Sequence, residues 1–181
     1  DDLELRVADN EAGENARTVF LPTINVMAYF NARLDAWEEG NRQYVYEKSE
    51  GKFGYIWVRD MMNSEYRKFI ARLNTYMADY DGVIIDFRYN SGGFTAGRIA
   101  EMLDDTPWLF SKLRGTSWVP EDYHRRGLSF QKANCGLFNY ACFSNAEMMC
   151  AAYRLKKLGP SVGMPTAGGV IGTSPVELLD G

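Results

Sequence analysis

The spacing of hydrophobic residues divides the chain into alternating strands and helices. Continuous apolar stretches, typical of strands covered on both faces of a sheet, occupy residues 53–61, 82–88 and 135–143. Helices are predicted between and after them, at residues 64–80, 95–105 and 144–159. Because strand and helix alternate, the sequence predicts an α/β fold with a largely parallel sheet.

The remaining segments carry weaker patterns. Residues 1–23 predict two short strands joined by a turn, a hairpin with no core of its own. A helix or broken helix follows over residues 25–48, with Gly40 at the break, and links the hairpin to the main domain. Three further expectations are an extended stretch at 107–118, a surface loop at 120–134, and short strands separated by glycine turns at 161–181.

Composition and charge narrow the class of protein. The 181 residues are 46% hydrophobic and 24% charged, which suits one well-buried core in a globular chain. A formal net charge of -4, with no basic stripe, predicts that nucleic acid is not a partner. The apolar runs are far shorter than the roughly 20 residues of a membrane-spanning helix. The chain begins without Met and without a signal-like apolar region, so we expect a processed or excised piece.

The residues that usually hold metals and cofactors are sparse. Three cysteines without a C-x-x-C pair, and the single histidine His124 far from them, predict no metal site. The cysteines are expected to be free thiols, which favours the cytoplasm over export. The glycine-rich loops match neither a Walker loop nor a dinucleotide fingerprint, so no cofactor is expected.

The loop "YNSGGF", residues 89–94, is the first place where chemistry could occur. It follows a buried strand and precedes a helix, and glycine allows backbone N–H groups to face a ligand closely. Such amides can hold a phosphate or a developing oxyanion. A tight turn with no ligand is the alternative.

Ser144 is the second place. The segment "SNAE" fits a capping box, in which Ser144 and Glu147 satisfy each other's backbone amides and stabilise the helix by roughly 1 kcal/mol. A serine at a strand-to-helix turn is also well placed as a nucleophile, and the two roles are compatible. Cys142 is a rival nucleophile that we expect to be buried inside the predicted strand.

The third place is "GMPTAGGVIG", residues 163–172. Sequential β/α units bring strand ends to one edge of the sheet, so this glycine-rich segment could form a wall of the same cleft. A plain turn is the alternative.

Taken in order, "SEGKFGYIWVRDM", "DGVIIDFRYNSGGF" and "ACFSNAEMMCAAYRLKKLGPSVGMPTAGGVIG" resemble the core of S41 serine peptidases. They are more similar to the tricorn protease branch than to the C-terminal processing peptidases. The resemblance runs from about residue 37 to the end. It implies a ClpP/crotonase-like β/α core at residues 51–181, a helical linker at 24–50, and the last strands of a PDZ-like module at 1–23.

The resemblance also implies roles for single residues. Ser144 matches the nucleophile, and the backbone N–H groups of Gly93 and Asn145 match the oxyanion hole. The implied substrate-binding residues are Gly92, Gly168 and Gly169.

The general base departs from the family pattern. Gly169 stands where processing peptidases carry a lysine, so a Ser-Lys dyad is not expected. The tricorn branch takes a histidine from before the PDZ module and a glutamate from beyond the position of Gly181, and neither maps to this sequence. His124 is interpreted as a solvated loop residue.

The expected function is a serine endopeptidase that cleaves peptides or unfolded proteins through an acyl-enzyme on Ser144, with the base supplied from outside this segment. A homo-oligomer is a possible assembly. One alternative is an inactive S41-fold binding or scaffold domain, in which Ser144 is only a cap. Another is a crotonase-type acyl-CoA enzyme, which would not use the serine.

Overall fold

The computed structural model describes residues 2–104, 110–112, 114–117, 119–120, 130 and 132–172. It divides the chain into two units, Asp1–Gly40 and Asn41–Gly181. The first unit contains the predicted hairpin, in which β1 (Asp2–Val7) pairs antiparallel with β2 (Arg17–Pro22). Helix α1 (Val26–Lys48) begins in this unit and runs through Gly40 without interruption, so of the two expected forms the structure has the continuous helix.

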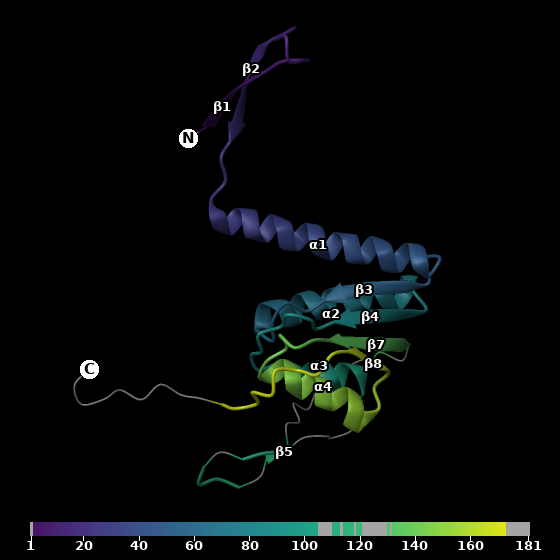
Figure 1. Cartoon of the computed structure of the whole chain (residues 1–181). Helices are drawn as coiled ribbons and strands as arrows, with labels where there is room; N and C mark the ends of the chain where they lie inside the picture. Colours follow the sequence, from purple (N-terminus) through teal and green to yellow (C-terminus); the bar gives the residue numbers. More distant parts are fainter. Residues whose placement is uncertain are drawn as a thin grey trace, which may run out of the picture. The chain divides into compact units, whose positions relative to one another are not determined.

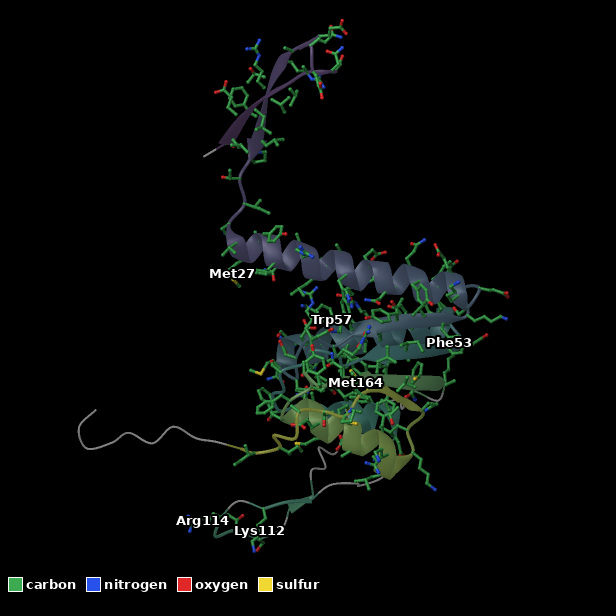
Figure 2. The ribbon with its side chains drawn as sticks, in the orientation of Figure 1. Met27, Phe53, Trp57, Lys112, Arg114 and Met164 are labelled. Carbon is green, nitrogen blue, oxygen red and sulfur yellow. The ribbon has the colours of Figure 1, made fainter. Side chains whose placement is uncertain are left out.

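The second unit is built on a parallel four-stranded sheet (Figure 1). Its strands, in spatial order, are β3 (Phe53–Trp57), β4 (Gly82–Asp86), β7 (Ala133–Phe138) and β8 (Ser161–Gly163). Every neighbouring pair is parallel, which confirms the predicted sheet. Figure 2 labels Phe53 and Trp57, the first and last residues of β3, and so marks the direction in which all four strands run.

Helices cover this sheet and complete the core. Helix α2 (Asn63–Asp79) packs along β3 and β4, and α4 (Asn145–Lys156) packs along β7 and β8. Helix α3 (Ala96–Leu103) lies against α4 (Figure 1). Below the ends of the central strands, the ring of Phe87 stacks on Phe138 at 5.2 Å, and Tyr153 of α4 meets both rings edge-on. These buried rings pack together where β4 and β7 end, next to the loops that follow the two strands.

The structure corrects several element boundaries. The predicted strand at 135–143 ends at Phe138, because the side-chain oxygen of Asn139 accepts hydrogen bonds from the amides of Tyr89 and Ala141 and turns the chain. The expected surface loop at 120–134 is wrong at its end, since β7 starts at Ala133.

The last two expectations concern short strands. In the described part of 161–181, β8 is the one strand, instead of several. The extended stretch at 107–118 is described only in part, as β5 (Phe110–Ser111) paired with β6 (Val119–Pro120). Among the residues described, none of the helices is both long and apolar enough to cross a membrane.

Candidate active site

The segments that follow the four parallel strands meet at the C-terminal ends of these strands. The side-chain amide of Asn90, after β4, donates to the carbonyl of Val58, after β3, at 2.9 Å. The amide of Phe143, after β7, donates to the carbonyl of Asn90 at 3.0 Å. The amide of Ala167, after β8, donates to the carbonyl of Cys142 at 3.0 Å. The three places singled out in the sequence are therefore brought together.

Ser144 occupies a strained turn between β7 and α4. Its backbone has φ 54° and ψ -119°, in the positive-φ region that residues with a side chain rarely adopt. The capping box between Ser144 and Glu147 is present, as the spacing predicts. A sharp, strained strand-to-helix turn of this kind is how a nucleophilic serine is presented above a sheet in other hydrolases. Strain of this size is retained where the surrounding structure fixes the backbone, and it points to function.

Asn90 fixes the glycine loop from inside. Its side chain is fully buried, and its side-chain oxygen accepts the amide of Gly92 at 2.9 Å. Together with its bonds to Val58 and Phe143, this leaves Asn90 with contacts to the loops on both sides. Because a buried, fully bonded amide costs free energy to displace, the loop is held in one conformation.

Gly92 and Gly93 lie directly beside Ser144 and Met61. Gly92 has φ 96°, and a β-carbon there would stand 2.8 Å from the β-carbon of Ser144. Gly93 has φ 145°, and a β-carbon there would stand 2.5 Å from the carbonyl oxygen of Met61. Neither position tolerates a larger residue without displacing its neighbour.

Two backbone amides near Ser144 are not used in the hydrogen bonding of the described residues. The carbonyl of Gly92 accepts the amide of Met61 at 2.9 Å, and the N–H of a trans peptide points opposite to its carbonyl, so the amide of Gly93 points away from Met61. The carbonyl of Ser144 likewise accepts from α4, so the amide of Asn145 points out of the helix start. Within the described residues, neither of these two amides has a hydrogen-bond acceptor.

The Glu147 carboxylate joins the Ser144 turn to the segment after β8. It accepts the amide of Ser144 at 2.8 Å, that of Gly168 at 2.5 Å and that of Gly169 at 2.9 Å. The hydroxyl of Thr166 bonds the same carboxylate. Burial raises the pKa of Glu147, but these hydrogen bonds outweigh it and lower the pKa below its ordinary value. Glu147 therefore stays ionised at neutral pH.

Cys142 is buried, as expected, although it lies in the loop after β7 and not in the strand. Its thiol donates to the carbonyl of Phe87 at 3.1 Å and accepts the amide of Asn139 at 3.3 Å. Burial raises the pKa of this thiol above its usual range. A buried, protonated thiol is a poor nucleophile, which leaves Ser144 as the stronger candidate.

Within the described residues, no histidine or lysine side chain bonds the Ser144 hydroxyl, and the side-chain contact of the Ser144 turn is the one with Glu147. A β-carbon at Gly169 would stand 2.1 Å from the ring of Phe143, so a lysine at this position would require the ring to move. His124 lies outside the described residues.

The sequence analysis missed the buried ion pair at the end of β4, just before the glycine loop. Asp86 is fully buried at the end of β4 and receives the hydroxyl of Tyr55 at 2.7 Å. The Arg88 guanidinium binds the same carboxylate through two nitrogens, at 2.9 and 2.5 Å. The sequence did carry a signal for this pair, since Asp86 and Arg88 stand two positions apart at the end of a buried apolar run. Buried charges are usually paired, so this spacing indicates an ion pair.

Comparison with known proteins places this arrangement in a family. The sequence model of peptidase family S41 matches residues 52–181. The tricorn protease homolog of Saccharolobus solfataricus is 33% identical over 77% of this chain. Tricorn protease homolog 1 of Streptomyces coelicolor is 32% identical over 99% of this chain. The chain belongs to peptidase family S41.

Solved structures show the same relationship. The crystal structure of the tricorn protease superposes with a TM-score of 0.70 and 26% sequence identity, covering 98% of this chain and 16% of that one. The photosystem II D1 C-terminal processing protease shares the fold, with a TM-score of 0.54 at 18% identity over 93% of this chain and 45% of that one. The chain spans 12% and 16% of the length of the two curated relatives named above.

Proposed function

We propose that this chain carries the nucleophile and oxyanion hole of a tricorn-like serine endopeptidase. The observation that carries the proposal is the strained turn of Ser144 beside the two unpaired amides of Gly93 and Asn145. A tetrahedral oxyanion needs two donors fixed about 3 Å from the developing charge, and this pair is fixed before substrate arrives.

Cleavage would follow the acyl-enzyme route. The Ser144 hydroxyl oxygen attacks the scissile carbonyl carbon while a base removes its proton, and the carbonyl oxygen gains charge between the amides of Gly93 and Asn145. The C–N bond then breaks, the amine leaves with the proton, and water hydrolyses the remaining ester. We propose that the base comes from a part of the full protein outside these 181 residues, because no histidine or lysine among the described residues bonds the Ser144 hydroxyl.

The substrate in this proposal is a peptide or unfolded protein in extended form. Strand β8 is at the outer edge of the described sheet, and Gly168 and Gly169 lie next to the Ser144 turn. An extended peptide can bind a protein by adding a strand to an exposed sheet edge through backbone hydrogen bonds. Glycines in such a wall let the backbone of the substrate come close.

A fluorophosphonate probe on the full-length protein tests the proposal. We expect labelling of the native protein and loss of both labelling and peptide hydrolysis in Ser144→Ala, with kcat/KM falling roughly 10⁴-fold or more. Ser64→Ala, which changes an exposed serine in α2, is the matched control and should label normally. The capping box favours a second candidate, a binding domain in which Ser144 is only a cap. An unlabelled native protein with unchanged peptide binding in Ser144→Ala would support that candidate instead.

A further inference from the structure

We propose that the side chain of Asn145 is a positioning residue that sets the distance between the two halves of the oxyanion hole. The inference rests on the proposed function and extends it. Asn145 contributes its backbone amide to the proposed site, whereas its side chain reaches across to the neighbouring helix. The two groups therefore serve the same site in different ways.

The side chain links α4 to the start of α3. Its oxygen accepts the amide of Ala96, the first residue of α3, at 2.8 Å, and its nitrogen lies 3.1 Å from the sulfur of Met148. Only 7% of Asn145 is exposed. Thr95, at the N-cap of α3, makes no capping bond with its own side chain. Asn145 thus caps α3 from another helix and satisfies an amide that Thr95 leaves open.

The link acts on the loop that carries the other donor. Ala96 follows Gly93 by three residues, and between them the amide of Phe94 donates to the carbonyl of Met61 at 2.9 Å. Thr95 is fully buried against the sulfur of Met61. The short segment is consequently fixed by Met61 on one side and by the Asn145 side chain on the other.

Spacing matters because both donors must reach the same oxygen. A displacement of about 1 Å in a catalytic group can cost roughly 100-fold in rate, even when the group itself is intact. Without the Asn145 oxygen, the amide of Ala96 loses its acceptor and the start of α3 is free to shift. The amide of Gly93 would then move relative to that of Asn145.

A purely structural role is separable from a positioning role by a matched control. Asn134 is another asparagine with little exposure, 9%, and its side chain donates to the carbonyl of Leu158 at 2.9 Å. It lies near the N-terminal end of β7, whereas Ser144 follows the C-terminal end of the same strand. Asn134→Ala removes a comparable buried amide without touching the proposed site.

The experiment uses the full-length protein, a chromogenic peptide and a peptide aldehyde, which forms an oxyanion with the serine. For Asn145→Ala we expect kcat to fall roughly 10- to 100-fold with KM changed less than about twofold. Aldehyde affinity should fall by the same factor as kcat/KM, because both report the oxyanion. Asn145→Asp keeps the acceptor and should recover most of the turnover. Asn134→Ala should lower the melting temperature and leave kcat unchanged.

The outcomes are distinguishable. Loss of melting temperature in Asn145→Ala with kcat and aldehyde affinity retained would overturn the positioning role. If Asn145→Ala does not fold, the same measurements on Asn145→Ser decide, since its short hydroxyl cannot reach Ala96 as the amide does; unchanged kcat there also overturns the inference. Undiminished turnover in Ser144→Ala would instead overturn the proposed function itself.

Discussion

The loops after β4 and β7 are held very differently from the segment after β8. Asn90 and Asn139 in these loops, and Asn145 at the start of α4, are buried, and their side chains bond the backbone of neighbouring segments. The segment after β8 exposes most of its side chains, including Met164, which Figure 2 labels. Its contact with the Ser144 turn depends on the amide of Ala167 and on the Glu147 carboxylate.

This difference separates two tasks of the proposed site. The part that would stabilise developing charge is preorganised by buried polar groups, as electrostatic catalysis requires. The part that would contact the substrate chain is held chiefly by one carboxylate and keeps an exposed face. Changes in the first part should therefore lower kcat, and changes in the second should act more on KM.

Among changes that leave Ser144 in place, the largest effect is expected from Gly92→Ala. The new methyl group would stand 2.8 Å from the carbonyl oxygen of Phe143 and from the β-carbon of Ser144, on a backbone with φ 96°. The Ser144 turn must move to admit it, so we expect kcat/KM to fall about 100-fold. Steady-state hydrolysis and the rate of phosphonate labelling in the full-length protein measure this directly.

Gly172→Ala is the control for that substitution, because a β-carbon at Gly172 meets nothing within 4 Å. It should change neither rate by more than about twofold. Equal activity in Gly92→Ala and Gly172→Ala would contradict the close contact between the glycine loop and Ser144.

A smaller effect is expected from Glu147→Gln. Glutamine has nearly the same shape, but its single carbonyl oxygen cannot accept the amides of Ser144, Gly168 and Gly169 together. The segment after β8 should loosen, and kcat/KM should fall about tenfold. Most of this fall should come from a higher KM and less of it from a lower kcat. Peptide hydrolysis over a range of substrate concentrations separates the two constants.

Glu65→Gln provides a matched control for the loss of a carboxylate. Glu65 is a buried glutamate in the first turn of α2, where its carboxylate bonds Lys68. This change should leave KM unaltered. A Glu147→Gln protein with native KM and a lowered kcat would show that the carboxylate serves the Ser144 turn alone.

All three residues of β8 are exposed, but β3 and β4 are almost wholly buried and were predictable because they read as continuous apolar runs. The end of β7 was not, since "GLFNYACF" stays apolar beyond Phe138. The chain turns there because Asn139 bonds Tyr89, which lies 50 positions earlier. The bond from Ala141 to Asn139 is local and typical of an asparagine turn, whereas the bond from Tyr89 cannot be read from the local sequence.

The site divides in the same way. The glycine pair and the Ser144–Glu147 spacing are local patterns, and each has a physical signature that can be read directly. The bonds from Glu147 to Gly168 and Gly169, and from Asn145 to Ala96, join residues that only the fold brings together. Sequence patterns thus located the reactive groups, whereas their supports required the structure.

The smallest expected effect is a dependence of stability on pH that comes from Glu147. Hydrogen bonds lower the pKa of this carboxyl in the folded chain below its value in the unfolded chain. Its ionised form therefore stabilises the fold above the ordinary glutamate pKa, and this contribution is lost as the pH falls through the lowered, folded-state value. We expect it to be on the order of 1 kcal/mol, as for a few hydrogen bonds to one charged group. Urea unfolding at pH 7 and at successively lower pH measures the loss.

Subtracting the same curve for Glu147→Gln isolates this carboxyl from the other acidic groups that titrate in the same range. Glutamine does not ionise, so the difference in unfolding free energy between the two proteins should be largest at neutral pH and shrink on acidification. A difference that stays constant and close to zero would mean that folding does not lower the pKa of this carboxyl and that the carboxylate contributes no more than the amide. The segment after β8 would then be held by the bond between Ala167 and Cys142, and the contrast with the two buried loops would rest on exposure alone.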